Sequence, residues 1–446
     1  MNLFYILIFF VLILCLIFMF KRSVFKPNSL SRLSTSESAT GNFNKIFEYF
    51  EGAGIPQDEK QAIESFRKGV EQGDARAQTN LGIAYSLGVS VKKDSAKAVK
   101  LFKDAAQQEY AAAQRLLGFS YLMGQGIAKN NLKALEWYRK AADQGDAIAQ
   151  VELGSMYENG QGVQIDCEKA VAWYQKAADQ GYADGQRLLG FSYFMGKGVA
   201  KSNSKAIFWY QKAADQGHSI AQNNLASMYA EGQGFKQDFL KAAELYKKSA
   251  EQGNSVAQNN LGYMYRDGQG VKKDLAKALE FFQKAADQGF LYAQYEVGKA
   301  YFMGKGVLQD NFKAIKWFRK AADQGEFRAQ FNLGYIFMVG HGVYANWAKG
   351  LKWYQKAAEQ GHSMAQNNLG IMHTYGQGVE KDFSKAFEWF QKAALQGLDE
   401  AQFNLGSMYD KGQGVKKDFS SAVEWYKKAA AQGHAGAIAA LKEKSS

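Results

Sequence analysis

The stretch Ala141–Gly181 reads AADQGDAIAQVELGSMYENGQGVQIDCEKAVAWYQKAADQG. Its Ala-Gln dipeptide, which ends at Gln150, returns every 36 residues without an insertion or a deletion, with Gly185 in place of the alanine in one copy. The glutamine stands at positions 78, 114, 150, 186, 222, 258, 294, 330, 366 and 402. A constant period of this length indicates stacked copies of one supersecondary unit, so the sequence predicts a solenoid.

Each unit contains two segments in which small and apolar residues follow helical spacing. Leu153 and Tyr157 lie four residues apart in the first segment, as do Ala170 and Tyr174 in the second. This spacing places the residues on one face of a helix. We therefore expect two amphipathic helices in each unit and an all-α fold.

Glycine and aspartate mark the expected ends of these helices. Gly160 and Gly162 interrupt the first helix, because glycine readily adopts the left-handed backbone that ends helices. Asp166 is a suitable N-cap for the second helix, and Gly181 ends that helix. Proline is absent from residues 57–446, so glycine provides all the breaks in the repeats.

The period divides the chain into five segments. Residues 77–436 hold ten full units, residues 41–76 a degenerate first unit, and residues 437–446 a closing helix and tail. This makes about eleven helix-turn-helix repeats. Before them lie the apolar residues 1–20 and a Ser-rich stretch, residues 21–40, which we interpret as a flexible tether.

The first twenty residues predict a transmembrane anchor. Residues 2–20 carry no charge and, apart from Asn2, are apolar, which is near the length needed to cross a bilayer as a helix. The alternative is a cleaved signal peptide, which needs basic residues before the apolar stretch and a small-residue cleavage site after it. Lipidation at Cys15 is disfavoured because the bulky Leu14 precedes it.

Positive charge follows the apolar segment, at Lys21, Arg22, Lys26 and Arg32. The positive-inside rule then predicts a single-pass membrane protein with its repeats in the cytoplasm, and a periplasmic or exported location is the alternative. Cys167 is the only cysteine outside the apolar segment, so no disulfide framework is possible within the repeats.

The formal net charge of the chain is +12. Residues 21–40 contribute +3 of it, which leaves +9 for the repeats, or less than one charge per unit. A nucleic-acid groove needs its Lys and Arg gathered on one surface, whereas an even spread is typical of solvated helix faces. We therefore predict no nucleic-acid partner.

Aromatic residues recur as a pair in the second helix of each unit. Trp173 and Tyr174 form one such pair, and seven of the eight tryptophans in the chain occupy the first position. A stripe at repeat spacing is far more often core than a stacking platform for bases. The exception is Trp347, which we place in the loop of the ninth unit.

The repeat resembles a known family. Its pattern is Ala-Gln-x-x-Leu-Gly-x-x-Tyr, then Gly-x-Gly-Val, then Asp, then Lys-Ala-x-x-Trp-Tyr-x-Lys-Ala-Ala-x-x-Gly. This is similar to the Sel-1-like repeat, a relative of the tetratricopeptide repeat. The period of 36 residues separates it from the tetratricopeptide period of about 34.

The resemblance implies a right-handed α-α superhelix that acts as an adaptor for proteins or peptides. Relatives are involved in signalling, in membrane-protein quality control and in contacts between bacteria and host cells. Disulfide-rich secreted relatives bond the helices of each repeat together, and this sequence lacks the cysteines for that. A secreted location is disfavoured on this ground.

Motifs for catalysis match only superficially. Gly190 to Gly198 resembles a phosphate loop but is one residue too long and has Gly198 in place of Ser or Thr. Ser65 and Lys68 match the Ser-x-x-Lys of penicillin-recognising enzymes, yet no Lys-Thr-Gly follows. The histidines lack metal-ligand spacing. The sequence predicts no enzyme, no catalytic or metal-binding residue, no cofactor and no small-molecule substrate.

The residues that differ between units are the candidates for binding. By analogy with the tetratricopeptide repeat, the concave face holds the residues that follow the glutamine, glycine and tyrosine of the first helix. An exposed lining of Phe, Tyr, Met and Arg is typical of a protein or peptide groove, and the alternative is that these side chains only pack between layers. The predicted protein-binding residues are Arg115, Phe119, Met123, Arg187, Phe191, Phe194, Met195, Asn223, Asn259, Tyr295, Phe302, Phe331, Tyr335 and Asn367.

Our hypothesis from the sequence is a membrane-tethered scaffold that binds other proteins or peptides along the concave face and the membrane through its N-terminal helix. One alternative is a hydrolase-type enzyme related to penicillin-recognising repeat proteins. Another is an exported or surface protein that contacts host or envelope partners, or an array that only spaces the envelope.

Overall fold

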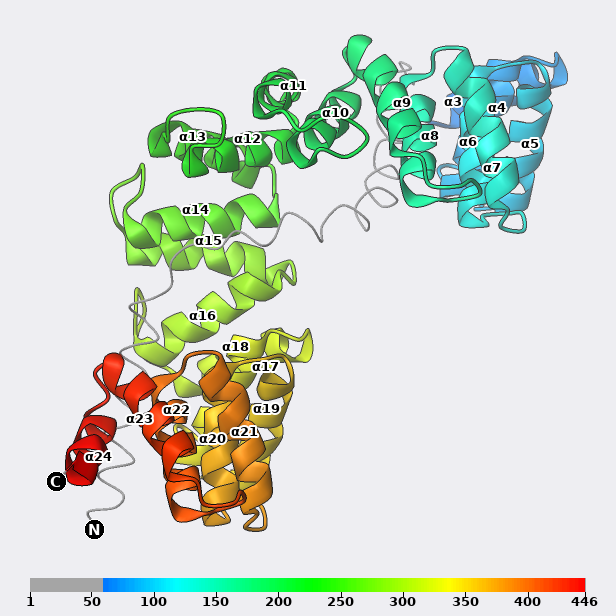
Figure 1. The fold of residues 1–446 in the computed structure, drawn as a ribbon. Coiled ribbons are helices and arrows are strands. Elements are labelled where there is room, and N and C mark those ends of the chain that lie inside the picture. Colours follow the sequence, from blue (N-terminus) through cyan, green and yellow to red (C-terminus); the bar gives the residue numbers. More distant parts are fainter. Residues whose placement is uncertain (1–58, 446) are drawn as a thin grey trace. The chain divides into compact units, whose positions relative to one another are not determined.

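The structure is a computed structural model that describes residues 59–445, and every regular element in that range is a helix. The described residues form 22 helices, α3 to α24, of 13 residues each except α24, which has 11. Figure 1 shows them along the chain. The all-α prediction is confirmed. The helices belong to two compact units, which are divided between Ile165 and Asp166.

The first unit contains six described helices, and within the unit each helix packs against its neighbours in the chain. Their bounds are α3 (Glu59–Glu71), α4 (Ala75–Leu87), α5 (Ser95–Gln107), α6 (Ala111–Met123), α7 (Asn131–Asp143) and α8 (Ala147–Asn159).

The second unit contains sixteen described helices with the same neighbour-on-neighbour packing. They are α9 (Cys167–Asp179), α10 (Ala183–Met195), α11 (Asn203–Asp215), α12 (Ser219–Glu231), α13 (Phe239–Glu251), α14 (Ser255–Asp267), α15 (Leu275–Asp287), α16 (Leu291–Met303), α17 (Asn311–Asp323), α18 (Phe327–Val339), α19 (Trp347–Glu359), α20 (Ser363–Tyr375), α21 (Phe383–Leu395), α22 (Asp399–Lys411), α23 (Phe419–Ala431) and α24 (Ala435–Ser445).

Helix ends follow the predicted glycines and aspartates. Gly160 caps α8 with a left-handed backbone at φ 70°, and Gly181 follows α9 at φ 85°. Asp166 accepts a hydrogen bond from the backbone N–H of Lys169 at 2.9 Å, as an N-cap of α9 does. A Cβ on Gly162 would lie 2.6 Å from the carbonyl oxygen of Asn131, so this loop packs directly on the start of α7.

Within each unit the core lies between consecutive helices. In one cluster Tyr210 of α11 is 1% exposed and Leu225 of α12 is fully buried. Gly190 of α10 faces that tyrosine, and a Cβ there would lie 2.8 Å from its ring. The small-residue column is therefore the place where consecutive helices approach most closely.

The second aromatic of each pair is buried as predicted, since Tyr138 and Tyr174 are each 1% exposed. The placement of Trp347 in a loop is wrong. It is the first residue of α19, because the side chain of Asn346 caps that helix by accepting the N–H of Lys349 at 2.9 Å. Its Cβ lies beside Gly378 in the loop of the next repeat.

The lysine column ahead of the aromatic pair is not simply solvated. The Nζ atoms of Lys133, Lys205 and Lys241 lie between 5.0 and 5.5 Å from the ring centroids of tyrosines in the paired helix. These lysines cover the tyrosine rings as cation–π partners while their charge stays in water.

The predicted anchor, residues 1–20, and the tether, residues 21–40, lie outside the described residues. Between residues 59 and 445 no helix is long and apolar enough to cross a bilayer. A 13-residue helix spans about 20 Å, short of the roughly 30 Å of a bilayer core. On this finding we correct the predicted localisation as a single-pass membrane protein, and it does not enter the proposals below.

Candidate protein-binding surface

Each repeat has a first helix, helix A, and a second, helix B. The A helices are the even-numbered ones from α4 to α24, and the B helices are the odd-numbered ones. We call the predicted binding residues and their equivalents the A-helix surface. In each A helix they follow the buried glutamine, the small glycine and the aromatic residue of the repeat, as Arg115, Phe119 and Leu122 do in α6.

Helix α6 contributes one buried, one half-buried and one exposed residue to this surface. Arg115 is 7% exposed, and its Nε lies 3.0 Å from Oδ2 of Asp146, the N-cap residue of α8. Phe119 is half-buried, and Met123 at the end of the helix is 42% exposed. The arginine therefore joins two layers, whereas the methionine faces solvent.

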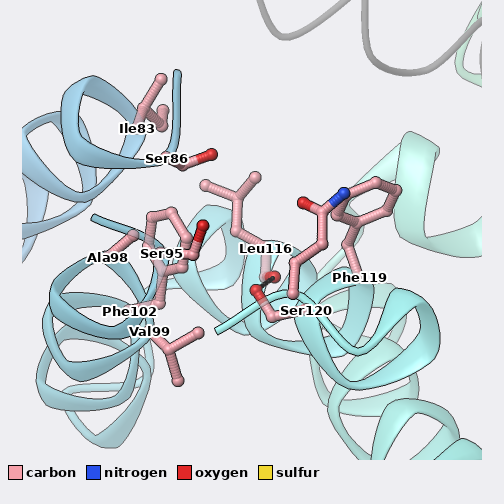
Figure 2. Close-up of a pocket in the computed structure, with 10 residues that line it drawn as sticks. Ile83, Ser86, Ser95, Ala98, Val99, Phe102, Leu116, Phe119 and Ser120 are labelled. Atoms are coloured by element: carbon pink, nitrogen blue, oxygen red, sulfur yellow. Dashed lines mark hydrogen bonds between the residues drawn. The ribbon is translucent and has the colours of Figure 1, made fainter. Parts of the chain in front are cut away.

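A small pocket lies beside Phe119 in the first unit. Side chains of α4 and α5 line one side, and Leu116, Phe119 and Ser120 of α6 line the other (Figure 2). Ser120 stands where Met156 fills the equivalent position of α8. The missing methionine side chain leaves room for about one water-sized group, which is too little for a ligand of its own.

Helix α10 has nearly the same sequence as α6 but different polar partners. The Nε of Arg187 lies 3.6 Å from Oδ1 of Asp184, one turn earlier in the same helix. That oxygen lies 2.8 Å from Nε2 of His218, the N-cap residue of α12. The other ring nitrogen of His218 accepts the N–H of Ala221 at 3.3 Å.

The predicted apolar binding residues of α10 are half-buried or exposed. Phe191 and Phe194 are half-buried against the cluster formed by α11 and α12. Met195 is 45% exposed at the end of the helix. The exposed methionine and half-buried phenylalanines thus repeat the arrangement of α6.

The three predicted asparagines are buried, and Asn223 and Asn367 accept hydrogen bonds from the next layer. Asn223 and Asn259 are each 4% exposed, and Asn367 is 6% exposed. Asn260 donates to Oδ1 of Asn223 at 3.3 Å, and Asn404 donates to Oδ1 of Asn367 at 3.0 Å. Their amides therefore serve packing between A helices in the first place.

Helices α14, α16 and α18 place a cluster of charges on the A-helix surface that we did not predict. Glu296 is 5% exposed at its centre and accepts the hydroxyl of Tyr263 at 3.3 Å. Nitrogen atoms of Arg266 and Lys299 each lie 3.6 Å from its Oε2. Burial lowers the pKa of Lys299, and the charge of Glu296 opposes that shift.

Arg328 of α18 extends this cluster. Its guanidinium carbon lies 4.4 Å from the ring centroid of Tyr295, which is 8% exposed. Its Nε lies 2.6 Å from Oε1 of Glu326, a buried carboxylate that caps the same helix. The signal in the sequence is that Glu296 stands at a position where six other A helices have asparagine, as Asn260 does in α14.

Helix α18 buries its predicted aromatic residues. Phe331 is 5% exposed and stacks on His362 of the next layer, with ring centroids 4.6 Å apart. Tyr335 is also 5% exposed and meets the half-buried Phe302 edge to face at 6.4 Å. Burial lowers the pKa of His362 to about 4, with the positive charge of Arg328 acting in the same direction.

Burial therefore divides the predicted binding residues into two sets, although it does not test their binding role. Seven are buried between layers, namely Arg115, Asn223, Asn259, Tyr295, Phe331, Tyr335 and Asn367. The other seven are half-buried or exposed, namely Phe119, Met123, Arg187, Phe191, Phe194, Met195 and Phe302. Only the second set can meet a partner without rearrangement.

A ladder of glutamines, which we had used only as markers of the period, joins the repeats. Gln114 is 3% exposed and donates to the carbonyl oxygen of Ala106, at the end of the preceding B helix. It accepts a hydrogen bond at 2.8 Å from Gln144, at the end of the following B helix. The same pair recurs in the second unit, for example between Gln252 and Gln222 at 2.8 Å.

The chain matches a family model for the Sel1 repeat in eleven consecutive segments. They are residues 46–74, 75–110, 111–146, 147–182, 183–218, 219–254, 255–290, 291–326, 327–362, 363–398 and 399–434. From α4 to α23, each segment holds one A helix and one B helix. None of the curated proteins matches the chain.

Two solved structures are similar over most of the chain. One is c5321, described as a protective antigen present in uropathogenic Escherichia coli strains displaying an SLR fold. It has 39% identity and a TM-score of 0.72, covering 85% of this chain and 82% of its own. The other is a Sel1 repeat protein from Oxalobacter formigenes, with 33% identity, a TM-score of 0.55, and coverage of 69% of this chain and 90% of its own.

Proposed function

The chain belongs to the Sel1 repeat family, and from this premise we propose that it is a scaffold which binds segments of other proteins along its A-helix surface. Arrays of this kind are suited to protein–protein interaction and generally are not enzymes. The finer part of the proposal concerns which residues make the contact.

One observation carries the proposal. Met123 and Met195 end two A helices of nearly the same sequence, and both are more than 40% exposed. Each lies on the same helix as a half-buried phenylalanine of the A-helix surface, Phe119 or Phe191. Flexible thioethers beside aromatic rings form adaptable apolar contacts, as protein-binding surfaces commonly do.

The buried half of the A-helix surface supports the same proposal in another way. Arg115, Asn223 and Phe331 are fixed by partners in the neighbouring layer. A surface whose base is held in this way loses little freedom when a partner binds, which favours affinity. We therefore assign contact to the accessible residues and positioning to the buried ones.

The test compares a surface variant with a matched control. The surface variant carries Met123→Asp, Phe119→Ser, Phe191→Ser and Met195→Asp in the full chain. The control carries Leu132→Asp and Leu240→Asp, two exposed leucines on B helices, 63% and 68% exposed. Circular dichroism and thermal melts show whether each variant keeps its helices.

We expect crosslinked partners recovered with the native chain and with the control to be lost from the surface variant. Recovery of the same partners by a folded surface variant would contradict the proposal. Loss from both variants would also contradict it, because the contact would then not be particular to the A helices.

A further inference from the structure

The most exposed apolar residues of the second unit gather in two consecutive repeats, residues 291–362. Leu308 is 89% exposed and Tyr344 is 98% exposed, at the same position of the loop between helix A and helix B. Phe312, near the start of α17, is 73% exposed. Elsewhere in this unit the loop position holds Ala200, Lys236, Lys272, Glu380 and Lys416.

These three residues lie close to one another. Leu308 belongs to the loop that leads into α17, where Phe312 is the second residue. A Cβ on Gly342 would lie 2.5 Å from the Cβ of Asn311, so the loop that carries Tyr344 rests on the first residue of α17. We call Leu308, Phe312 and Tyr344 the edge patch.

The two repeats that carry the edge patch have a net positive charge. Residues 291–362 hold ten basic and five acidic residues, whereas the next two repeats, residues 363–434, hold eight of each. Our expectation of an even spread of charge is therefore not met in this part of the chain.

One position on the B helices shows this difference most clearly. The sixth residue is Lys316 in α17 and Lys352 in α19, and both are exposed. The helices on either side carry Glu280 and Glu388 there. Lys316 is four residues after Phe312, so the cation and the apolar side chain share one face of α17.

We propose that the edge patch is a second docking surface, which binds an acidic segment of a partner protein that also carries apolar side chains. Exposed aromatic and aliphatic side chains grouped on one edge mark interaction sites. The lysines around them attract acidic residues and repel basic ones, which fixes the charge of the partner. This proposal does not rest on binding at the A-helix surface.

The limited extent of the patch favours a protein segment over a lipid surface. Layers of packed helices lie roughly 10 Å apart, so a patch two repeats wide extends about 20 Å. The repeats on either side present Lys272 and Glu380 at the equivalent loop position. A bilayer would contact the loops of all these repeats, whereas a short segment needs only two.

The test selects random dodecapeptides from a display library against the native full chain. The patch variant carries Leu308→Lys, Phe312→Ser and Tyr344→Lys, which are residues found at equivalent positions of other repeats, such as Lys272 and Ser384. The control is Leu240→Ser, at the same position of α13 as Phe312 has in α17. Charge is tested with Lys316→Glu and Lys352→Glu.

We expect the selected peptides to contain more acidic than basic residues and at least one aromatic or aliphatic residue. Their Kd should rise at least tenfold for the patch variant, rise for the charge variants, and stay unchanged for Leu240→Ser. Peptides that are basic, that bind the folded patch variant equally well, or that are never enriched would overturn the proposal.

Two further experiments distinguish this proposal from lipid binding and from binding at the A-helix surface. Sedimentation with phosphatidylcholine–phosphatidylserine vesicles that is lost in the patch variant would mean that the patch binds lipid, and would also overturn the proposal. The A-helix surface variant described above is used in the second experiment. Peptides that bind the patch variant but not the A-helix surface variant bind at the A-helix surface only. The two proposals can therefore fail separately.

Discussion

Helices α6 and α10 share ten of their thirteen residues, yet the same arginine has different surroundings in each. In α6 it pairs with Asp146, which caps the following A helix. In α10 it pairs with Asp184 of its own helix, and that carboxylate also meets the cap of the following A helix, His218.

The difference lies partly within the helices, because α10 has Asp184 where α6 has Ala112, and partly in the layer that follows. Position for position they contribute the same glutamine, arginine, leucines, glycine, phenylalanine and serine. The next layer supplies a carboxylate to α6 and an imidazole to α10. The environment of a repeat position is therefore set by the adjacent layer as much as by the residue at that position. The predictions below alter one side of this comparison at a time.

The largest effect is expected from Asp146→Ala. Its carboxylate accepts the guanidinium N–H of the buried Arg115 and the backbone N–H of Ala149 at 2.8 Å. Losing both contacts should lower the free energy of unfolding by about 3 to 4 kcal/mol, measured by urea denaturation. Asp184→Ala in the second unit should have a smaller effect, because Arg187 is more exposed than Arg115. Equal losses would contradict the comparison.

The cap of a third A helix tests the comparison by pH. His362 caps α20 through Nδ1, which accepts the N–H of Ala365 at 3.2 Å, and its ring faces Phe331 instead of a carboxylate. Because its folded pKa is about 4, the unfolded chain binds more protons between pH 6.5 and 4. The free energy of unfolding should therefore fall as the pH is lowered through that window.

This fall should amount to about 2 to 3 kcal/mol from His362 alone. Urea denaturation at pH 7.5 and at pH 4.5 measures it, and His362→Asn provides the control. Asparagine can keep the cap, as Asn254 does for α14. The same pH dependence in that variant would show that His362 is not its source.

A smaller effect is expected where the two helices differ in how closely they pack. A Cβ on Gly190 would lie 2.8 Å from the ring of Tyr210, whereas one on Gly118 would lie 3.1 Å from the ring of Tyr138. We expect Gly190→Ala to cost about 2 kcal/mol and Gly118→Ala about 1 kcal/mol in thermal melts. The cost stays moderate because Ala226 already occupies this position in α12. Equal costs, or the reverse order, would show that α10 does not pack more closely than α6 on the following helix.

The smallest effect on folding is expected at the exposed ends of the same helices. Met123→Ser and Met195→Ser should each change the free energy of unfolding by less than about 0.5 kcal/mol, because both side chains lie largely in solvent. Differential scanning calorimetry can measure this. A loss above 1 kcal/mol in either variant would mean that the methionine packs into its layer rather than serving as a contact surface.

Features that depend on a few neighbouring residues could be predicted from the sequence. The left-handed glycine at Gly160 and the cap at Asp166 are fixed by local backbone chemistry, and both are found in the structure. Tyr174 is buried because the repeat pattern alone places it on the inner face of its helix. The observed position of Trp347, which we misplaced in a loop, also follows from a local rule. Asn346 caps α19, and Trp347 is the first residue of that helix.

Features that depend on contact between repeats could not be predicted in this way. Arg115 was assigned to the surface from its position, but Asp146, 31 residues later, holds it in the interior. Phe331 is buried for a similar reason, because His362 covers it from the next layer. The repeat pattern treats the copies as equivalent, whereas these contacts depend on which two copies are adjacent.

The glutamine ladder has a consequence for how such a gene can change. The buried glutamines have partners at fixed separations, such as 8 residues to Ala106 and 30 residues to Gln144 for Gln114. Recombination that duplicates or deletes one complete repeat leaves these separations intact at every remaining layer. Any other change of length within the array places an amide opposite the wrong neighbour. The ladder thus permits inheritance of longer or shorter arrays only in whole repeats.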